Sequence, residues 1–243
     1  MSASEFRQPT TSGRSSQRAG SVWLRTQERP PRRDRLTRER IVEAAVALLD
    51  EDGVGGLTMR RLADRLAVTP TALYWHVATK DDVLDLAVDE IFADVPLPPA
   101  AGEWQDDVRA LTRQWRTVML RHPWAPGLIG RPMLGPNVLA RTEFLQSALV
   151  RGDFTGTRLA VTVRLIANYV IGAALTEATW RQSAASEARA QARHQIAANA
   201  AAYPTLVASG YLGDAECTDD ELFERGIEAI LATSSDSGVR RTQ

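Results

Sequence analysis

The stretch that decides the fold is residues 57–77, LTMRRLADRLAVTPTALYWHV. Thr58 and Thr69 each stand directly before a short run of residues with apolar side chains at helical spacing, where an N-cap is needed. Pro70 suits the first position of the second run, because that position has no intrahelical backbone hydrogen bond to lose. A brief turn at 67–68 separates the runs. The stretch therefore predicts two short helices joined by a tight turn.

The flanking sequence predicts a helix on each side of this pair. Upstream, apolar residues recur at i, i+3, i+4, i+7 and i+8, which is one face of a helix: Ile41, Ala44, Ala45, Leu48 and Leu49. Thr37 can cap this helix and Gly53 can end it in the left-handed conformation, which gives a predicted span of 38–52. Downstream, Thr79 and Asp82 have the spacing of a capping box that begins another helix.

Two short helices packed on a preceding helix form a helix-turn-helix. On a helical wheel of the last helix, Pro70, Leu73 and Val77 share one face, which we expect to pack inward. Thr71 and Trp75 lie on the opposite face. An unconstrained surface helix usually exposes Glu and Lys, so a face of Thr, Tyr and Trp indicates a partner surface. A DNA major groove would fit such a helix.

The rest of the chain also reads as helical, and no stretch alternates like a strand. The predicted helices are 104–121, 138–150, 157–181, 185–202 and 218–232. We predict an all-α fold with an N-terminal three-helix helix-turn-helix DNA-binding domain and a C-terminal α-helical ligand-binding and dimerisation domain. The expected boundaries are a disordered Arg-rich tail at 1–32, the DNA-binding domain at 33–80, the effector domain at 81–234 and a disordered tail at 235–243.

The charge distribution and the cysteine and histidine content limit the classes of function that the protein can have. The net charge is −1, but residues 1–40 carry ten arginines against four acidic residues, which indicates a local anionic partner. The arginines either track a minor groove or belong to a free tail, and the free tail is the favoured interpretation. The one cysteine, Cys217, excludes an internal disulfide and a cysteine zinc site. The three histidines are far apart in sequence, so we expect no metal.

Enzyme motifs and a membrane span are both absent from the sequence pattern. There is no nucleophile elbow, phosphate loop or dinucleotide fingerprint, so we expect no catalytic residues and no cofactor. The longest apolar uncharged run, 165–176, is shorter than the ~20 residues that a membrane helix needs. We therefore expect a cytoplasmic protein with no membrane partner.

Residues 33–95 resemble the TetR (tetracycline-repressor) family. The resemblance rests on 57–63, 69–77, 79–81 and Leu84, and the Leu-Tyr-Trp-His-Val string at 73–77 is typical of the tetracycline-repressor branch itself. The segments Trp104-Gln105-Asp106 and Gly130-Arg131-Pro132 are similar to the effector domain of that branch. The resemblance implies a homodimeric repressor that binds a palindromic operator and is released by a small molecule. An activator, or a DNA-binding protein without an effector, remains the alternative.

The family's DNA contacts carry over to matching positions of this chain. Arg60 matches a base-reading position, and a guanidinium paired with guanine contributes about 1–3 kcal/mol of discrimination. The positions at the start of the recognition helix approach bases, those at its end contact the backbone and groove wall, and two others anchor phosphates. The predicted DNA-binding residues are Thr58, Arg60, Pro70, Thr71, Tyr74, Trp75, His76 and Lys80.

Several of these residues have a purely structural alternative. Tyr74 could be partly core, Trp75 could cover its own helix, and His76 is as well suited to a structural hydrogen bond as to a phosphate contact. Arg61 and Arg65, which flank the base-reading position, are expected to be solvated surface rather than specific readers of sequence.

The larger domain offers candidates for an effector pocket, with ordinary core packing as the alternative for each. Asn168 stands out because it lies in an apolar run, where a buried amide needs either a neighbour or a ligand as its partner. The candidate lining residues are Trp104, Trp115, Met119, Trp124, Phe144, Asn168 and Tyr169.

Tetracycline itself is not the effector that the sequence predicts. Leu111 and Thr176 stand where the resembling branch has an amide and a carboxylate, and 127–130 lacks that branch's histidine. We therefore expect a metal-independent, largely apolar small molecule. The predicted helices 157–181 and 218–232 of two subunits should form a four-helix dimer interface.

Overall fold

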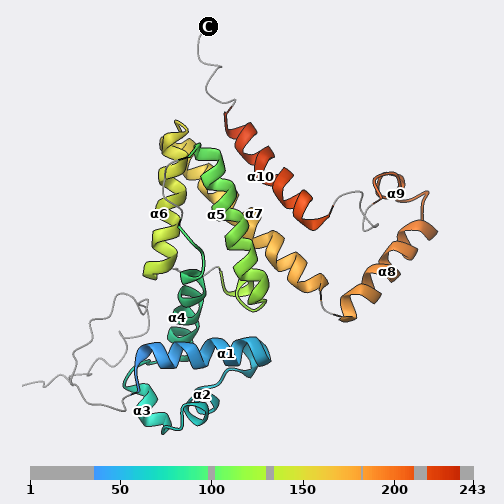
Figure 1. Ribbon diagram of the computed structural model, residues 1–243. Coiled ribbons are helices and arrows are strands. Elements are labelled where there is room, and N and C mark those ends of the chain that lie inside the picture. Colours follow the sequence, from blue (N-terminus) through green and yellow to red (C-terminus); the bar gives the residue numbers. More distant parts are fainter. Residues whose placement is uncertain (1–35, 98–101, 130–133, 182, 211–217, 236–243) are drawn as a thin grey trace, which may run out of the picture.

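The computed structural model describes residues 36–97, 102–129, 134–181, 183–210 and 218–235, which are helical with short connections and contain no strand (Figure 1). The all-α prediction is confirmed. The predicted tail at 1–32, and nearly all of that at 235–243, lie outside the described residues. The elements are α1 Arg38–Gly56, α2 Met59–Arg65, α3 Pro70–Tyr74, α4 Lys80–Ala93, α5 Trp104–Arg121, the 3-10 turn η2 Pro126–Leu128, α6 Pro136–Arg151, α7 Gly156–Trp180, α8 Ser183–Ala198, α9 Pro204–Ala208 and α10 Asp219–Ser235.

The first helices begin where the sequence predicts. The hydroxyls of Thr37, Thr58 and Thr69 accept hydrogen bonds from the first-turn N–H groups of α1, α2 and α3. Gly53 interrupts α1 with φ 66°, at the position where the helix was expected to end. The apolar face of α1 is buried against α4, which crosses it. Local sequence therefore determines this unit.

The recognition helix α3 is shorter than the predicted span to Val77. It ends at Tyr74, but the N–H groups of His76 and Val77 both donate to the carbonyl of Leu73, at 2.9 and 3.1 Å. This continued turn buries Val77 beside Leu73. Between α2 and α3, Ala67 adopts φ 54°, the left-handed region that favours glycine.

Helices α6, α7 and α10 pack around α5. The bounds of α5 match the predicted 104–121, whereas α6, α7 and α10 each differ from prediction by one to three residues at an end. The short helix α9 was not predicted. Figure 1 shows α8 and α9 leading away from α5 and α6, beyond the end of α7.

Helix α7 has the length and mean hydropathy of a membrane-spanning segment, although less than a quarter of its apolar window is buried in the protomer. The sequence-based expectation that no segment qualifies considered only the uncharged run 165–176, and α7 extends beyond that run at both ends. Length and composition alone are weak evidence for a span, because a long helix that packs against α5 and α10 passes the same test.

Candidate DNA interface and effector domain

The exposed side of α3 is aromatic. Leu73 and Val77 are buried against the preceding helices, whereas Thr71 and half of the Tyr74 side chain are exposed. Trp75 is 83% exposed. The alternative that Trp75 covers its own helix is therefore wrong. A large indole in water is unfavourable unless a partner covers it, and this position supports an intermolecular contact.

Pro70 does not pack inward as the helical wheel suggested. It occupies the first position of α3 and is exposed, because the first turn extends past the small core formed with α1 and α2. This correction removes Pro70 from the core but keeps it at the solvent-facing start of the recognition helix, beside the exposed Thr71.

The three arginines of α2 differ in what they bind. Arg65 makes two hydrogen bonds to the Glu51 carboxylate, at 2.7 and 2.8 Å, and these raise the pKa of Arg65. Arg61 pairs with Asp52 and donates to the Gly56 carbonyl. The guanidinium of Arg60 is exposed and has no hydrogen-bond or ion-pair partner in the part of the chain that the structure describes. Arg60 is therefore the α2 arginine available to an outside acceptor.

The remaining predicted DNA-binding residues have structural roles as well. Thr58 is exposed, and its hydroxyl caps α2 by accepting from the Arg61 N–H at 3.2 Å. The Lys80 ammonium donates to the carbonyl of Val54 at 2.8 Å, which ties the start of α4 to the end of α1. His76 is half-buried. Because an ammonium has three donors, the bond of Lys80 to Val54 leaves two for a phosphate.

A polar contact joins the DNA-binding helices to the larger domain. The Asp50 carboxylate on α1 lies 2.7 Å from His122 Nδ1 and accepts a hydrogen bond from Trp124 Nε1, also at 2.7 Å. The two rings meet edge to face, with centroids 5.9 Å apart. Both follow α5 in sequence. Trp124 is thus a domain-joining residue, a role that the sequence did not reveal because the partners lie more than 70 positions apart.

Six of the seven predicted pocket residues lie in or against one core, and Asn168 is the exception. Trp115 and Met119 are buried on the inner face of α5, and the Trp115 ring meets Phe92 of α4 edge to face at 5.5 Å. Trp104 packs edge-on against Phe154 at 5.3 Å. The indole N–H of Trp115 is buried and has no acceptor among the described residues. Trp115 is therefore the candidate whose polar atom remains unsatisfied.

The two predicted residues on α7 differ in burial. Asn168 is exposed in the protomer, so the expectation of a buried amide is wrong: α7 uses its other face to contact α5 and α10. Tyr169 is partly buried, but its hydroxyl donates to the carbonyl of Leu222 at 3.0 Å and its ring stacks on Phe223. Burial raises the pKa of Tyr169. Phe144 is partly buried against the core.

A cluster of ion pairs, which the sequence did not reveal, connects α5 to α7 and α10. Arg116 is only 5% exposed and donates to Glu177 on α7 and Asp220 on α10, each at 2.6 Å. Burial alone would lower the pKa of Arg116, but its hydrogen bonds with Asp220 and Glu177 raise it. Glu177 also pairs with Arg181. The carboxylate next to Thr176 is therefore already occupied by arginines.

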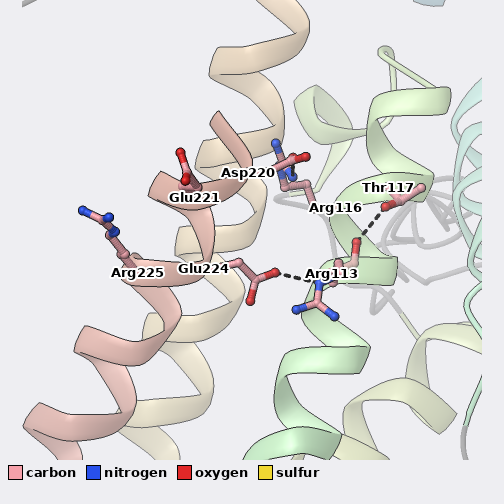
Figure 2. A pocket seen from close by; sticks show the side chains of 7 residues that line it. All are labelled: Arg113, Arg116, Thr117, Asp220, Glu221, Glu224 and Arg225. Atoms are coloured by element: carbon pink, nitrogen blue, oxygen red, sulfur yellow. Dashed lines mark hydrogen bonds and ion pairs between the residues drawn. The ribbon is translucent and has the colours of Figure 1, made fainter. Parts of the chain in front are cut away.

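Next to this cluster, α5 and α10 border a cavity of about 520 Å³ (Figure 2). Its lining is almost entirely charged, and Arg113 donates to Glu224 across it at 2.7 Å. The lining residues are Arg113, Arg116, Thr117, Asp220, Glu221, Glu224 and Arg225. Among the described residues no group of three or more His, Cys, Asp or Glu side chains could hold a metal ion.

Two family models match the chain and divide it as the fold does. Residues 41–87 match the model for bacterial regulatory proteins of the tetR family, and residues 95–233 match the tetracyclin repressor-like C-terminal domain. The chain belongs to the TetR family. It is a helix-turn-helix transcriptional regulator, as the resemblance of its recognition helix implied.

Some relatives of this TetR-family chain match most of its length and others little more than a third of it. An HTH-type transcriptional regulator of Saccharopolyspora erythraea is 42% identical over 215 residues, which are 88% of this chain and 90% of the relative. The tetracycline repressor protein class D of Escherichia coli is 42% identical over 91 residues, 36% of this chain and 42% of the relative. The apo structure of ActR from Streptomyces coelicolor superposes with a TM-score of 0.73 at 31% identity, over 82% of this chain and 95% of ActR.

Proposed function

We propose that this regulator is a homodimeric repressor that binds a palindromic operator and leaves it when a small molecule binds. Residues 33–80 form the DNA-binding domain and 81–234 the effector domain, in the cytoplasm where the DNA is. The observation that carries the proposal is the exposed aromatic face of α3, flanked by the guanidinium of Arg60, which has no partner among the residues that the structure describes. Arg60 would read a guanine, and Trp75 and Tyr74 would line the groove wall.

The outer face of α7 supports the dimer. Val161, Leu165 and Leu175 are exposed on it, and Gly172 and the polar Asn168 lie between them. An exposed apolar stripe along a helix of 25 residues is a surface that a second copy would cover. With α10 it would form the four-helix interface. Such a dimer presents two recognition helices about 34–36 Å apart, the spacing of successive major grooves.

The effector domain supports a largely apolar ligand with at least one hydrogen-bond acceptor. Leu111 is fully buried at the position where the tetracycline branch has an amide, so the polar drug contact is missing there. The buried N–H of Trp115 has no acceptor among the described residues, and a ligand oxygen would satisfy it. ActR has been crystallised with (S)-DNPA and with actinorhodin. We propose actinorhodin as the first probe for this chain.

Trp115 would also transmit the effect of ligand binding to the DNA-binding domain. Its ring touches Phe92 on α4, and α4 crosses and packs against α1 of the DNA-binding domain. A ligand that moves this ring would shift α4 and change the spacing of the recognition helices. It must bind the two states with different affinities, with a coupling of typically about 1–3 kcal/mol.

The DNA-binding part of the proposal is tested by selecting bound duplexes from a random library with the purified full chain. We expect an inverted repeat with half-sites one helical turn apart, bound by two chains per duplex. A selected sequence without two-fold symmetry, or one chain per duplex, would contradict it. The selected site placed at a reporter promoter should lower expression, and a rise would identify an activator.

The effector part is tested by fluorescence anisotropy of the labelled operator. Actinorhodin should release the duplex without added metal, and Trp115→Phe, which keeps an aromatic ring but removes the N–H donor, should require a higher concentration. Isothermal titration with tetracycline and magnesium should show no binding at micromolar concentrations. Tight metal-dependent tetracycline binding would overturn the proposed effector class.

A further inference from the structure

The described part of the DNA-binding domain carries no net charge. Residues 36–80 contain six basic and six acidic side chains, with histidine counted as neutral. Binding to DNA of any sequence depends mainly on Lys and Arg side chains that neutralise phosphates, so a neutral unit has little of that affinity. Two of the six basic residues, Arg61 and Arg65, lie on the same short helix as the proposed base reader Arg60, and both are paired with carboxylates of α1.

The Arg61 side chain reaches back to the end of α1. Its Nη1 donates to the Gly56 carbonyl at 2.7 Å, and its Nη2 donates to the Asp52 carboxylate. This approach depends on glycine at 56, because an added Cβ would lie 2.2 Å from Asp52 Cβ and 3.0 Å from Arg61 Nη1. Two acceptors on α1 therefore hold a guanidinium that is one position from Arg60 in the sequence.

Arg65 is held in the same way one turn later on α2. Both of its terminal nitrogens donate to the Glu51 carboxylate, at 2.7 and 2.8 Å, and this hydrogen bonding lowers the pKa of Glu51. The side chains of both pairs are between 36% and 52% exposed, so the pairs contribute little to folding stability. The arginines would nevertheless be accessible to a DNA backbone lying against α2.

We propose that Asp52 and Glu51 are positioning residues that keep Arg61 and Arg65 off the phosphate backbone, and that they thereby increase discrimination between the operator and other DNA. The inference rests on the proposed function and deepens it, since it assigns what limits binding to other sequences. A phosphate that bound Arg61 would have to displace two acceptors that the fold already holds in place. Phosphate contacts carry no sequence information, whereas base contacts do.

Released arginines would favour random DNA over the operator. On the operator, base contacts fix the register and orientation of α2, so an extra guanidinium meets only the phosphates that this register offers. On random DNA no base contact fixes the register, and the protein can take the one in which the extra guanidinium binds best. A carboxylate that holds the arginine removes this advantage of random DNA.

The test compares the full-length wild type with Asp52→Asn, which keeps the size of the side chain and removes its charge. Anisotropy at several salt concentrations gives the affinities for the selected operator and for a random duplex of the same length. Affinity for the random duplex should rise by about tenfold at low salt, and the slope of log affinity against log salt should steepen by about two for a dimer, because each neutralised phosphate adds about 0.9. Affinity for the operator should rise by less than about threefold, so the ratio of the two affinities falls.

Glu51→Gln should change both quantities in the same direction but by less. Arg65 lies one turn farther than Arg61 from the start of α2, where Thr58 and Arg60 would meet the DNA.

Matched controls separate the release of Arg61 from a change in net charge. Glu43→Gln removes an exposed carboxylate of α1 that has no arginine partner among the described residues, and it should leave both affinities within about twofold of wild type. Gly56→Ala keeps every charge but displaces Arg61 from Asp52, so it should act like Asp52→Asn. Its own control is Gly55→Ala, which adds a Cβ where nothing lies within 4 Å. If Gly56→Ala fails to fold, Asp52→Asn carries the test, because it changes a partly exposed side chain without changing its size.

The outcomes distinguish this inference from the proposed function. If the wild type selects no inverted repeat, the proposed function fails. If it selects one and Asp52→Asn leaves the random-duplex affinity and its salt slope unchanged, the carboxylate does not restrain Arg61. If both affinities rise by the same factor, or if Glu43→Gln has the same effect as Asp52→Asn, the pairing does not set discrimination. Each of these last three results would overturn the inference.

Discussion

The ion pairs of the helix-turn-helix unit and those of the effector domain differ in sequence separation and in burial. In the first unit Arg61 pairs with Asp52 and Arg65 with Glu51, residues nine and fourteen positions apart on neighbouring exposed surfaces. In the effector domain Arg116 pairs with Glu177 and Asp220, 61 and 104 positions away, and is buried. The comparison teaches that local sequence can build the proposed DNA-reading surface, whereas the helices proposed to respond to a ligand depend on contacts between residues far apart in sequence.

The largest expected effect breaks the dimer. Leu165→Asp places a charge on the exposed apolar face of α7, and a dimer that buries this face would dissociate. Operator affinity should fall by about 100-fold or more, because a single half-site loses the advantage of two linked contacts. Sedimentation velocity would measure the dissociation of the dimer, and anisotropy would measure the operator affinity.

The matched control for this change is Leu139→Asp on α6. The two leucines have nearly the same exposure, 46% for Leu165 and 47% for Leu139. The control should remain a dimer and bind the operator normally. Equal dissociation of both variants, or of neither, would show that α7 is not the interface.

The second-largest expected effect compares the stability contributed by a buried ion pair with that of an exposed one. Arg116→Ala leaves the buried Glu177 without this partner and should lower the free energy of unfolding by about 3–5 kcal/mol. Arg61→Ala removes an exposed pair and should lower it by less than about 1 kcal/mol. Urea unfolding of both variants measures the difference. Similar losses would mean that burial of the pair does not matter.

A smaller effect is expected on operator affinity rather than on folding stability. Arg60→Ala should weaken binding to the selected operator by about 1–3 kcal/mol while leaving random duplex and the unfolding temperature almost unchanged. Arg65→Ala, whose guanidinium is paired with Glu51, should change operator affinity little. Anisotropy with both duplexes gives the comparison. Equal losses on operator and random DNA would assign Arg60 to a phosphate.

The smallest effect is a pH dependence on α4. Burial, together with the charges of Asp89 and other acidic neighbours, raises the pKa of Glu90. A raised carboxyl pKa means that the folded state disfavours the carboxylate, so the destabilisation is present above the folded pKa and vanishes below the unfolded value of about 4.3. Glu90→Gln should therefore gain less than about 1 kcal/mol at pH 7 and nothing at pH 4. A gain that persists at pH 4 would contradict this cause.

The sequence predicted the first unit almost residue by residue because its signals are local. Three threonine caps, one left-handed glycine and the capping box of Thr79 and Asp82 set the helix boundaries, and each acts within four positions. The exposure of Trp75 followed from helical geometry alone. Pro70 was misplaced because the wheel gives the direction of a side chain but not how far the core extends along the helix.

In the effector domain the sequence predicted the helices but not the contacts between them. Asn168 was expected inside because its neighbours in sequence are apolar, yet that face of α7 is left open by the protomer. The Asp89 carboxylate of α4 accepts from the Val138 N–H at the start of α6, and Arg141 of α6 donates to the carbonyls of Ala93 and Val95. These contacts also escaped prediction, since no pattern shows which distant helix lies beside a polar residue. Only Gly135-Pro136, a helix start without its own cap, was a signal that a partner elsewhere must supply one.

The most direct test of the central claim, that two copies of the exposed α3 face enter one duplex, is a hydroxyl-radical footprint of the wild-type protein on its selected operator. We predict two protected regions related by two-fold symmetry, with centres about 34–36 Å apart along the duplex axis. One protected region, or two without symmetry, would contradict the account.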